Sequence, residues 1–89
     1  MVSMKDLSVI KDISKKYNVE KVLLFGSSLE DGEQAGDIDI AVSGIKDDMF
    51  YRYYGEMIIG LSKPVDIVNL ADNNGFSRLI SKEGMVIYG

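Results

Sequence analysis

Three aspartates and one Gly-Ser step are the residues of this chain whose types and spacing could do chemistry. Asp37 and Asp39 stand two residues apart, so in a β-strand both carboxylates would point to one face. The isoleucines between and after them would point to the other face, into a core. Like charges roughly 7 Å apart repel each other unless a cation lies between them. Mg²⁺ is usually held by one or two carboxylates together with substrate phosphates, so the pair indicates a magnesium site.

The Gly26-Ser27 step follows an apolar run, residues 21–25, and offers the other half of such a site. A glycine lets a phosphate come close to the backbone. A serine that begins a helix offers its hydroxyl and its N–H at the positive end of the helix dipole. Further along, Asp66 is a third carboxylate in an otherwise apolar segment, VDIVNL. We therefore predict that the turn holds a polyphosphate and that the aspartates hold its metal.

Each of these residues also has a purely structural explanation. Asp37 and Asp39 could face solvent on an edge strand, where charges discourage aggregation. Ser27 could serve only as a helix N-cap, and Asp66 could be a charge close to a turn. The combination favours the site, because three separate features point to the same chemistry.

Periodicities of 3.6 and 2 residues predict the elements that must position these side chains. The predicted helical segments are Met4 to about Tyr17, a short turn through Leu29 and Glu30, Lys46 or Asp47 to Leu61 with Asp47 as N-cap, and Phe76 to Lys82. The predicted strands are Lys21 to Phe25, Asp37 to Val42, Val65 to Leu70 and Met85 to Tyr88, with a loop over Asp31 to Gly36 and a turn at residues 73–75. The first strand is apolar throughout and should be central in its sheet.

Apolar residues at three- and four-residue spacing mark the helix faces that should be buried. They are Leu7, Ile10, Ile13 and Tyr17 in the first helix, Phe50, Tyr53, Tyr54, Met57, Ile58 and Leu61 in the next long helix, and Phe76, Leu79 and Ile80 in the last. Tyr51 should face outward. Phe50 and Tyr54 either pack against the sheet or form a surface for a partner.

Composition excludes several kinds of protein. The 89 residues are 46% hydrophobic and 27% charged, which is ordinary for one small globular domain spanning residues 1–89. Cysteine and histidine are absent, which excludes disulfides, thiolate or imidazole metal sites and Ser-His-Asp hydrolysis within this chain. A net charge of −4 argues against direct nucleic-acid binding. No apolar run could cross a membrane and no signal peptide is recognisable, so we expect a cytoplasmic protein.

Gly26-Ser27, a nine-residue spacer and then Asp37-Ile38-Asp39 resemble the signature of the polymerase-beta-like nucleotidyltransferases. The whole chain resembles the small branch called minimal nucleotidyltransferases. That resemblance implies an α+β fold, a small mixed β-sheet backed by helices, and transfer of a nucleoside monophosphate from a nucleoside triphosphate to a hydroxyl. It also implies a role for each matching residue: Gly26 and Ser27 hold the β- and γ-phosphates of ATP, Asp37 and Asp39 ligate Mg²⁺, and Asp66 completes a second metal site and helps to deprotonate the hydroxyl.

The same resemblance implies a partner. Proteins of this small branch are similar to the antitoxin halves of toxin-antitoxin pairs, whose toxins are all-helical HEPN-domain ribonucleases. The acceptor implied is a tyrosine of that toxin, which receives AMP and is silenced. One departure from the family stands out: an arginine commonly follows the Gly-Ser turn, whereas Ser28-Leu29-Glu30-Asp31 contains no basic residue. Lys46 or Lys63 would have to take its place.

Two other functions are compatible with these residues. The first is a binding module without catalysis, which would neutralise a helical partner by covering it; the acidic Glu30 and the aromatic helix around Tyr51 favour this alternative. The second is a regulatory domain that binds nucleotide with Mg²⁺ but has no acceptor.

Overall fold

The computed structural model describes residues 2–29, 36–72 and 74–89. Its α-helices are α1 (Met4–Lys16), α2 (Phe50–Gly60) and α3 (Gly75–Glu83), its 3₁₀ helices are η1 (Gly26–Leu29) and η2 (Asp47–Met49), and its strands are β1 (Lys21–Leu24), β2 (Ile38–Ser43), β3 (Val65–Asn69) and β4 (Met85–Tyr88). This order confirms the one predicted from the sequence. Glu30 and most of the expected loop, Asp31 to Ala35, lie outside the described residues.

The strands form one mixed sheet in the order β3-β2-β1-β4. β1 pairs antiparallel with both β2 and β4, and β2 pairs parallel with β3. β1 is therefore interior, as its apolar sequence predicted. β2 is interior too, so Asp39 does not lie on an edge strand, and that explanation of its charge is wrong. The parallel step from β2 to β3 is made through α2, because parallel neighbours need a long crossover connection.

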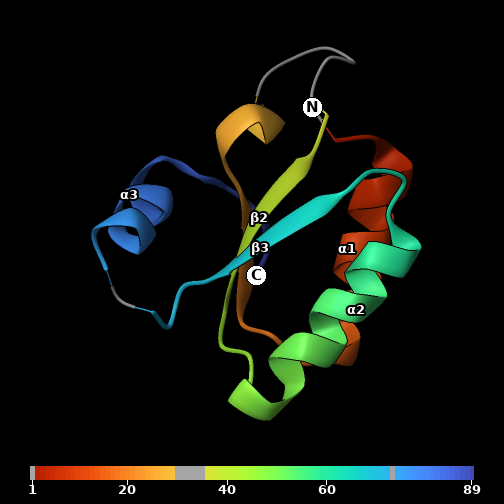
Figure 1. Cartoon of the computed structure of the whole chain (residues 1–89), viewed down its shortest axis with the longest axis horizontal. Coiled ribbons are helices and arrows are strands. Elements are labelled where there is room, and N and C mark those ends of the chain that lie inside the picture. The colour runs from red at the N-terminus through yellow and green to blue at the C-terminus, as the bar shows by residue number, and fades with distance from the viewer. Residues whose placement is uncertain (1, 30–35, 73) are drawn as a thin grey trace.

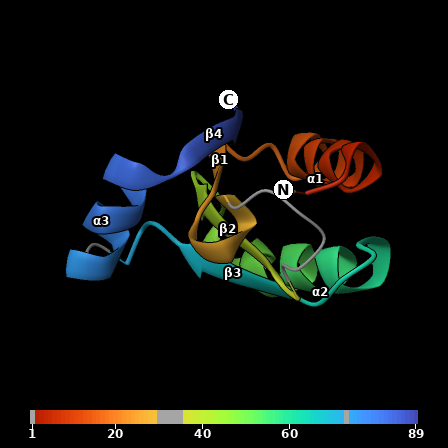
Figure 2. The ribbon, with the colours of Figure 1, turned by 90° about the horizontal axis from the view of Figure 1, so that it is seen from above.

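Helices lie on both sides of this sheet. Figures 1 and 2 show α1 and α2 side by side against one face and α3 against the other. Alternate apolar side chains of the strands point toward α1 and α2. The core on that side consists of Ile10, Val19, Val22, Leu24, Ile38, Ile40, Val42, Ile45, Tyr53, Met57, Leu61, Val65 and Ile67. The opposite face of β2 and β3 carries polar side chains, among them Asp39 and Asp66.

Polar contacts hold α1 and α2 together in an antiparallel arrangement. Inside the core, the Ser14 hydroxyl and the Tyr53 hydroxyl are hydrogen-bonded at 2.8 Å. Toward the N-terminus of α1, the buried Asp6 carboxylate accepts the Ser62 N–H at 3.1 Å. The core therefore depends on satisfied polar groups as well as on apolar packing, since an unpartnered buried hydroxyl would cost stability.

Tyr54 protects the outer edge of the sheet. Its hydroxyl donates to the Val65 carbonyl and accepts the Ile67 N–H, both at 3.2 Å. These backbone groups belong to the edge strand β3, where unpaired groups would otherwise invite another strand. Of the two alternatives for Tyr54, packing against the sheet is the one that the structure confirms.

Some predicted details of the helices are wrong. Asp47 is not an N-cap: it begins the 3₁₀ helix η2, and α2 starts at Phe50 with no side-chain cap. Ile58, Phe76 and Leu79 were predicted to face inward, yet their exposed fractions are 60%, 54% and 50%. The reason is that each helix touches the sheet along a narrow strip, which in α3 leaves only Ser77 and Ile80 buried. Tyr51 faces outward as predicted and is 82% exposed.

Tyr53→Phe should lower the free energy of unfolding by about 1–2 kcal/mol, because the buried Ser14 hydroxyl loses its partner. Chemical denaturation near neutral pH measures this change. Tyr51→Phe is the matched control, since it makes the same replacement on the same helix at an exposed position and should change stability by less than about 0.5 kcal/mol. Equal losses in the two variants would contradict the role given to the buried pair.

Stability should also fall at alkaline pH in a way that depends on Tyr53. Burial raises the pKa of Tyr53 from 10.0 to about 12. The unfolded chain therefore loses this proton first, and the stability present below pH 10 is lost as the pH rises toward 12. Between about pH 9 and about pH 11, wild type should lose roughly 1–1.5 kcal/mol more than Tyr53→Phe. Identical pH profiles would show that this group does not control the loss.

Candidate functional site

The register of the two parallel strands brings Asp39 and Asp66 together. Asp39 of β2 is the direct partner of Asp66 in β3. Partners in a sheet point to the same face, and neighbouring strands lie about 4.8 Å apart. Because Ile38 and Ile67 are buried on the side of α1 and α2, both carboxylates lie on the opposite face. Asp66 is exposed there and Asp39 is half-buried.

The Gly26 turn lies directly against Asp39. Gly26 has a φ of +60°, a conformation that glycine adopts without strain. A Cβ at this position would come within 2.9 Å of the Asp39 Oδ2 atom. The Gly26 backbone therefore packs directly against the Asp39 carboxylate, closer than a residue with a Cβ could lie. A glycine turn of this kind also lets a phosphate approach the backbone N–H groups, beside carboxylates that can hold its cation.

Ser28 holds Asp39 in position, a role that sequence reasoning missed. The Asp39 N–H donates to the Ser28 hydroxyl oxygen at 2.6 Å, and the Phe25 N–H donates to the Asp39 carbonyl at 3.1 Å. Ser28 is 1% exposed, so its hydrogen bond to Asp39 is a buried contact that links η1 to β2. The available signal was a second serine after the turn, a residue type that often bonds to nearby backbone. The backbone of Ser27 lies in η1, but its side chain is outside the described residues.

Asp37 stands slightly apart from the strand pair. It lies in a bend one residue before β2 and is exposed. Among the residues that the structure describes, no group of three or more acidic side chains is placed to hold a metal ion. The role of Asp37 as a ligand stays a prediction. The two carboxylates on β2 and β3 are enough for Mg²⁺ when substrate phosphates supply further oxygens, so the residues present fit that ion.

The two lysines considered in place of the missing arginine lie at different ends of the sheet. Lys63 precedes β3 and is therefore close in sequence to Asp66 at the start of that strand. Lys46 follows the far end of β2, where it lines a pocket of about 560 Å³ with Lys16 and Arg52. Lys46 is therefore too far along the sheet to meet a triphosphate at Gly26. Lys63 is the lysine of the two that could take the place of the missing arginine.

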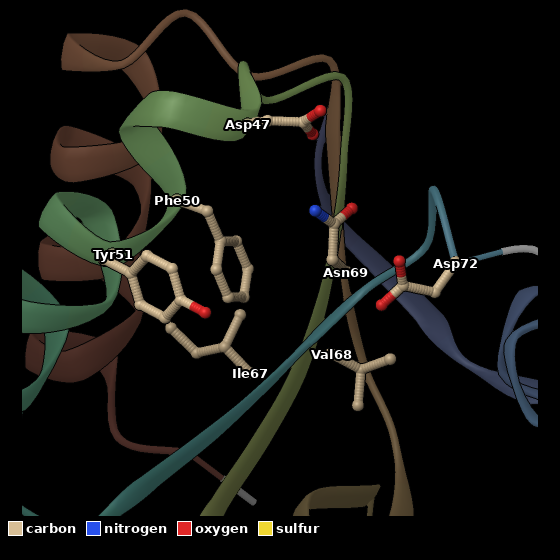
Figure 3. A pocket seen from close by; sticks show the side chains of 7 residues that line it. All are labelled: Asp47, Phe50, Tyr51, Ile67, Val68, Asn69 and Asp72. Atoms are coloured by element: carbon tan, nitrogen blue, oxygen red, sulfur yellow. The ribbon is translucent and has the colours of Figure 1, made fainter.

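A separate pocket of about 480 Å³ lies between α2 and β3 (Figure 3). The rings of Phe50 and Tyr51 lie on one side of it, near Ile67, and the carboxylates of Asp47 and Asp72 lie on the other. None of the residues predicted for the site lines this pocket. It opens beside α2, whereas Asp39 and Asp66 are on the opposite face of the sheet, so the two sites are distinct.

The fold is that of the polymerase beta-like nucleotidyltransferases. The family model described as "Polymerase beta, Nucleotidyltransferase" matches residues 8–89, and the chain belongs to that family. Its fold is similar to that of a chain in the crystal structure of the toxin-antitoxin MntA-HepT. That match has a TM-score of 0.73 and 18% sequence identity, and it covers 98% of this chain and 73% of the other.

A search of curated proteins found no match. None of the described helices has both the length and the apolar character that crossing a bilayer requires.

Asp66→Asn should make the metal-free protein more stable, by a few tenths of a kcal/mol up to about 1 kcal/mol, because it removes repulsion across the strand pair. Added Mg²⁺ should raise the melting temperature of wild type and have less effect on Asp66→Asn. Thermal unfolding with EDTA and with Mg²⁺ measures both effects.

Asp72→Asn is the control for this prediction, since Asp72 is an exposed aspartate beyond the end of β3 and its replacement changes the net charge equally. A variant at position 66 that is less stable than wild type without metal, or that responds to Mg²⁺ as wild type does, would contradict the account of the pair.

Proposed function

We propose that this chain is a Mg²⁺-dependent nucleotidyltransferase that transfers AMP from ATP to a hydroxyl of a partner protein. The observation that carries the proposal is the pairing of Asp39 with Asp66 next to the Gly26 turn. Membership of the nucleotidyltransferase family supports the reaction type. That the acceptor is a hydroxyl of a protein is our proposal.

Each residue has a defined task in this reaction. The backbone of the Gly26 turn, which only a glycine lets pack this closely against Asp39, receives the β- and γ-phosphates. Asp39, whose backbone is held by Ser28 and Phe25, and Asp66 would hold the cation, which would supply positive charge for the α-phosphate. Asp37, exposed in the bend before β2, would supply a further oxygen ligand. Mg²⁺, when bound, offsets the phosphate charge and stabilises the entering and leaving oxygens.

The covalent step is an in-line displacement at the α-phosphorus. The acceptor oxygen forms a bond to that phosphorus as the bond to the bridging oxygen of the β-phosphate breaks, and pyrophosphate leaves with the electron pair. The hydroxyl proton passes to the Asp66 carboxylate, the exposed member of the pair and thus the one that an incoming acceptor can reach. Since the chain has no histidine, a carboxylate is the simplest base available to it.

We further propose that the acceptor is a tyrosine of an all-helical HEPN-domain toxin, and that this chain acts as its antitoxin. The structural similarity to a chain of the toxin-antitoxin MntA-HepT supports this choice of partner. The exposure of Asp66 supports an acceptor that is itself a folded protein, because such an acceptor can reach this carboxylate from solvent.

The second candidate is neutralisation of the same partner by binding alone. Exposed apolar side chains on α2 favour it: Tyr51 and Ile59 are 82% and 87% exposed, and the neighbouring Ile58 is 60% exposed. Such side chains on a helix surface are typical of protein interfaces. This surface lies on the helical side of the sheet and so does not depend on the carboxylates.

Labelled AMP transfer distinguishes the two candidates. With α-labelled ATP, Mg²⁺ and a HEPN-domain protein encoded beside its gene, wild type should label that protein. Asp39→Asn and Asp66→Asn should each reduce the transfer rate by about 100-fold or more, because several kcal/mol of charge stabilisation is lost. Asp72→Asn should transfer as wild type does. A stable complex that silences the toxin without label, equally well in all four proteins, would show that binding alone is the function.

A further inference from the structure

We propose that an apolar pocket between β1 and α3, next to the Gly26 turn, binds the purine base of the nucleotide. This inference rests on the proposed function, which places the triphosphate at Gly26. The pocket has a volume of about 200 Å³. That volume is below the roughly 300 Å³ at which pockets for drug-sized ligands begin, so one flat ring system is the ligand that fits.

Aromatic side chains form the walls of this pocket. Phe25 follows β1 and Phe76 lies in the first turn of α3, and their rings meet edge to face with centroids 5.9 Å apart and an interplanar angle of 84°. Leu79 lines the pocket one helical turn further along α3. Rings set at a right angle leave the face of one ring free beside the edge of the other. A nucleobase can stack on such a face, because every base has a flat aromatic surface.

The exposure of these side chains indicates that something covers them. Phe76 and Leu79 are 54% and 50% exposed although both belong to the apolar stripe of α3. The helix is held in this position from below, since a Cβ at Gly84 would lie only 3.0 Å from the Leu24 carbonyl. α3 therefore comes close to β1 and keeps the two phenylalanines beside each other. An occupant with an apolar ring would bury them without moving the helix.

Continuity with the phosphate site identifies that occupant. Gly26 lines the pocket and also touches the Asp39 carboxylate, so the two sites share a wall. A nucleoside triphosphate has the matching arrangement, with an anionic tail at one end and an aromatic base at the other. Glu83 at the rim of the pocket can accept an N–H from the edge of the base. The two-ring purines cover both phenylalanines, whereas one pyrimidine ring covers less.

Binding of three ligands in Mg²⁺ tests the inference: ATP, UTP and ribose 5-triphosphate, which is the same tail without a base. By calorimetry, ATP should bind wild type about 10-fold tighter than ribose 5-triphosphate and about fivefold tighter than UTP. Phe76→Ala should weaken ATP by about 10-fold and leave ribose 5-triphosphate unchanged, and Phe76→Leu should do the same while keeping an apolar side chain. Tyr51→Ala, an exposed aromatic on α2, should bind all three as wild type does.

The outcomes separate this inference from the proposed function. If ATP and ribose 5-triphosphate bind with equal affinity, the base pocket is wrong and the phosphate site stands. The same conclusion follows if the Phe76 variants bind ATP with the affinity of wild type. UTP binding as tightly as ATP overturns the assignment to purines. If no ligand binds wild type in Mg²⁺, both the base pocket and the proposed function are overturned.

Discussion

The parallel register of β2 and β3 sets two carboxylates side by side, and the candidate site is built on that pairing. A shift of one residue in either strand would turn its aspartate toward the core. The register is fixed from the other face, where the isoleucines at 38, 40 and 67 are buried under α1 and α2. The apolar half of the sheet thus determines the geometry of its polar half.

Several features outside the pair serve to keep it in place. The long crossover through α2 makes the parallel pairing possible, and Tyr54 of that helix ties back to both sides of the backbone at Asp66 through Val65 and Ile67. On the next strand, Ser28 binds the backbone of Asp39 from η1. The two acidic side chains are therefore anchored independently, and neither anchor uses the carboxylate itself.

The alternation of polar and apolar residues was enough to predict the faces of the strands, but not which strands are neighbours. Asp66 was selected as an acidic residue in an apolar segment, and its pairing with Asp39 follows from a parallel contact that periodicity does not encode. Ser28 was not selected, because its role depends on a hydrogen bond across the turn. The second strand was predicted to begin at Asp37, one residue before its actual start at Ile38.

For the helices, the sequence pattern identified the apolar side chains but not which of them are buried. Periodicity correctly identified an apolar stripe on α3, but the stripe was assigned wholly to the core, whereas Phe76 and Leu79 lie half exposed beside the Gly26 turn. A pattern shows which side chains avoid water and cannot show what covers them. At α2, Asp47 was predicted to be the N-cap, although the chain first makes a 3₁₀ turn there.

A crystal structure with Mn²⁺ and a non-hydrolysable ATP analogue would locate the metal site, because anomalous scattering identifies the position of the ion. We expect an anomalous peak bonded to carboxylate oxygens of both Asp39 and Asp66, with the triphosphate against the backbone of Gly26. Nucleotide bound elsewhere, or an ion that contacts neither aspartate, would contradict this expectation.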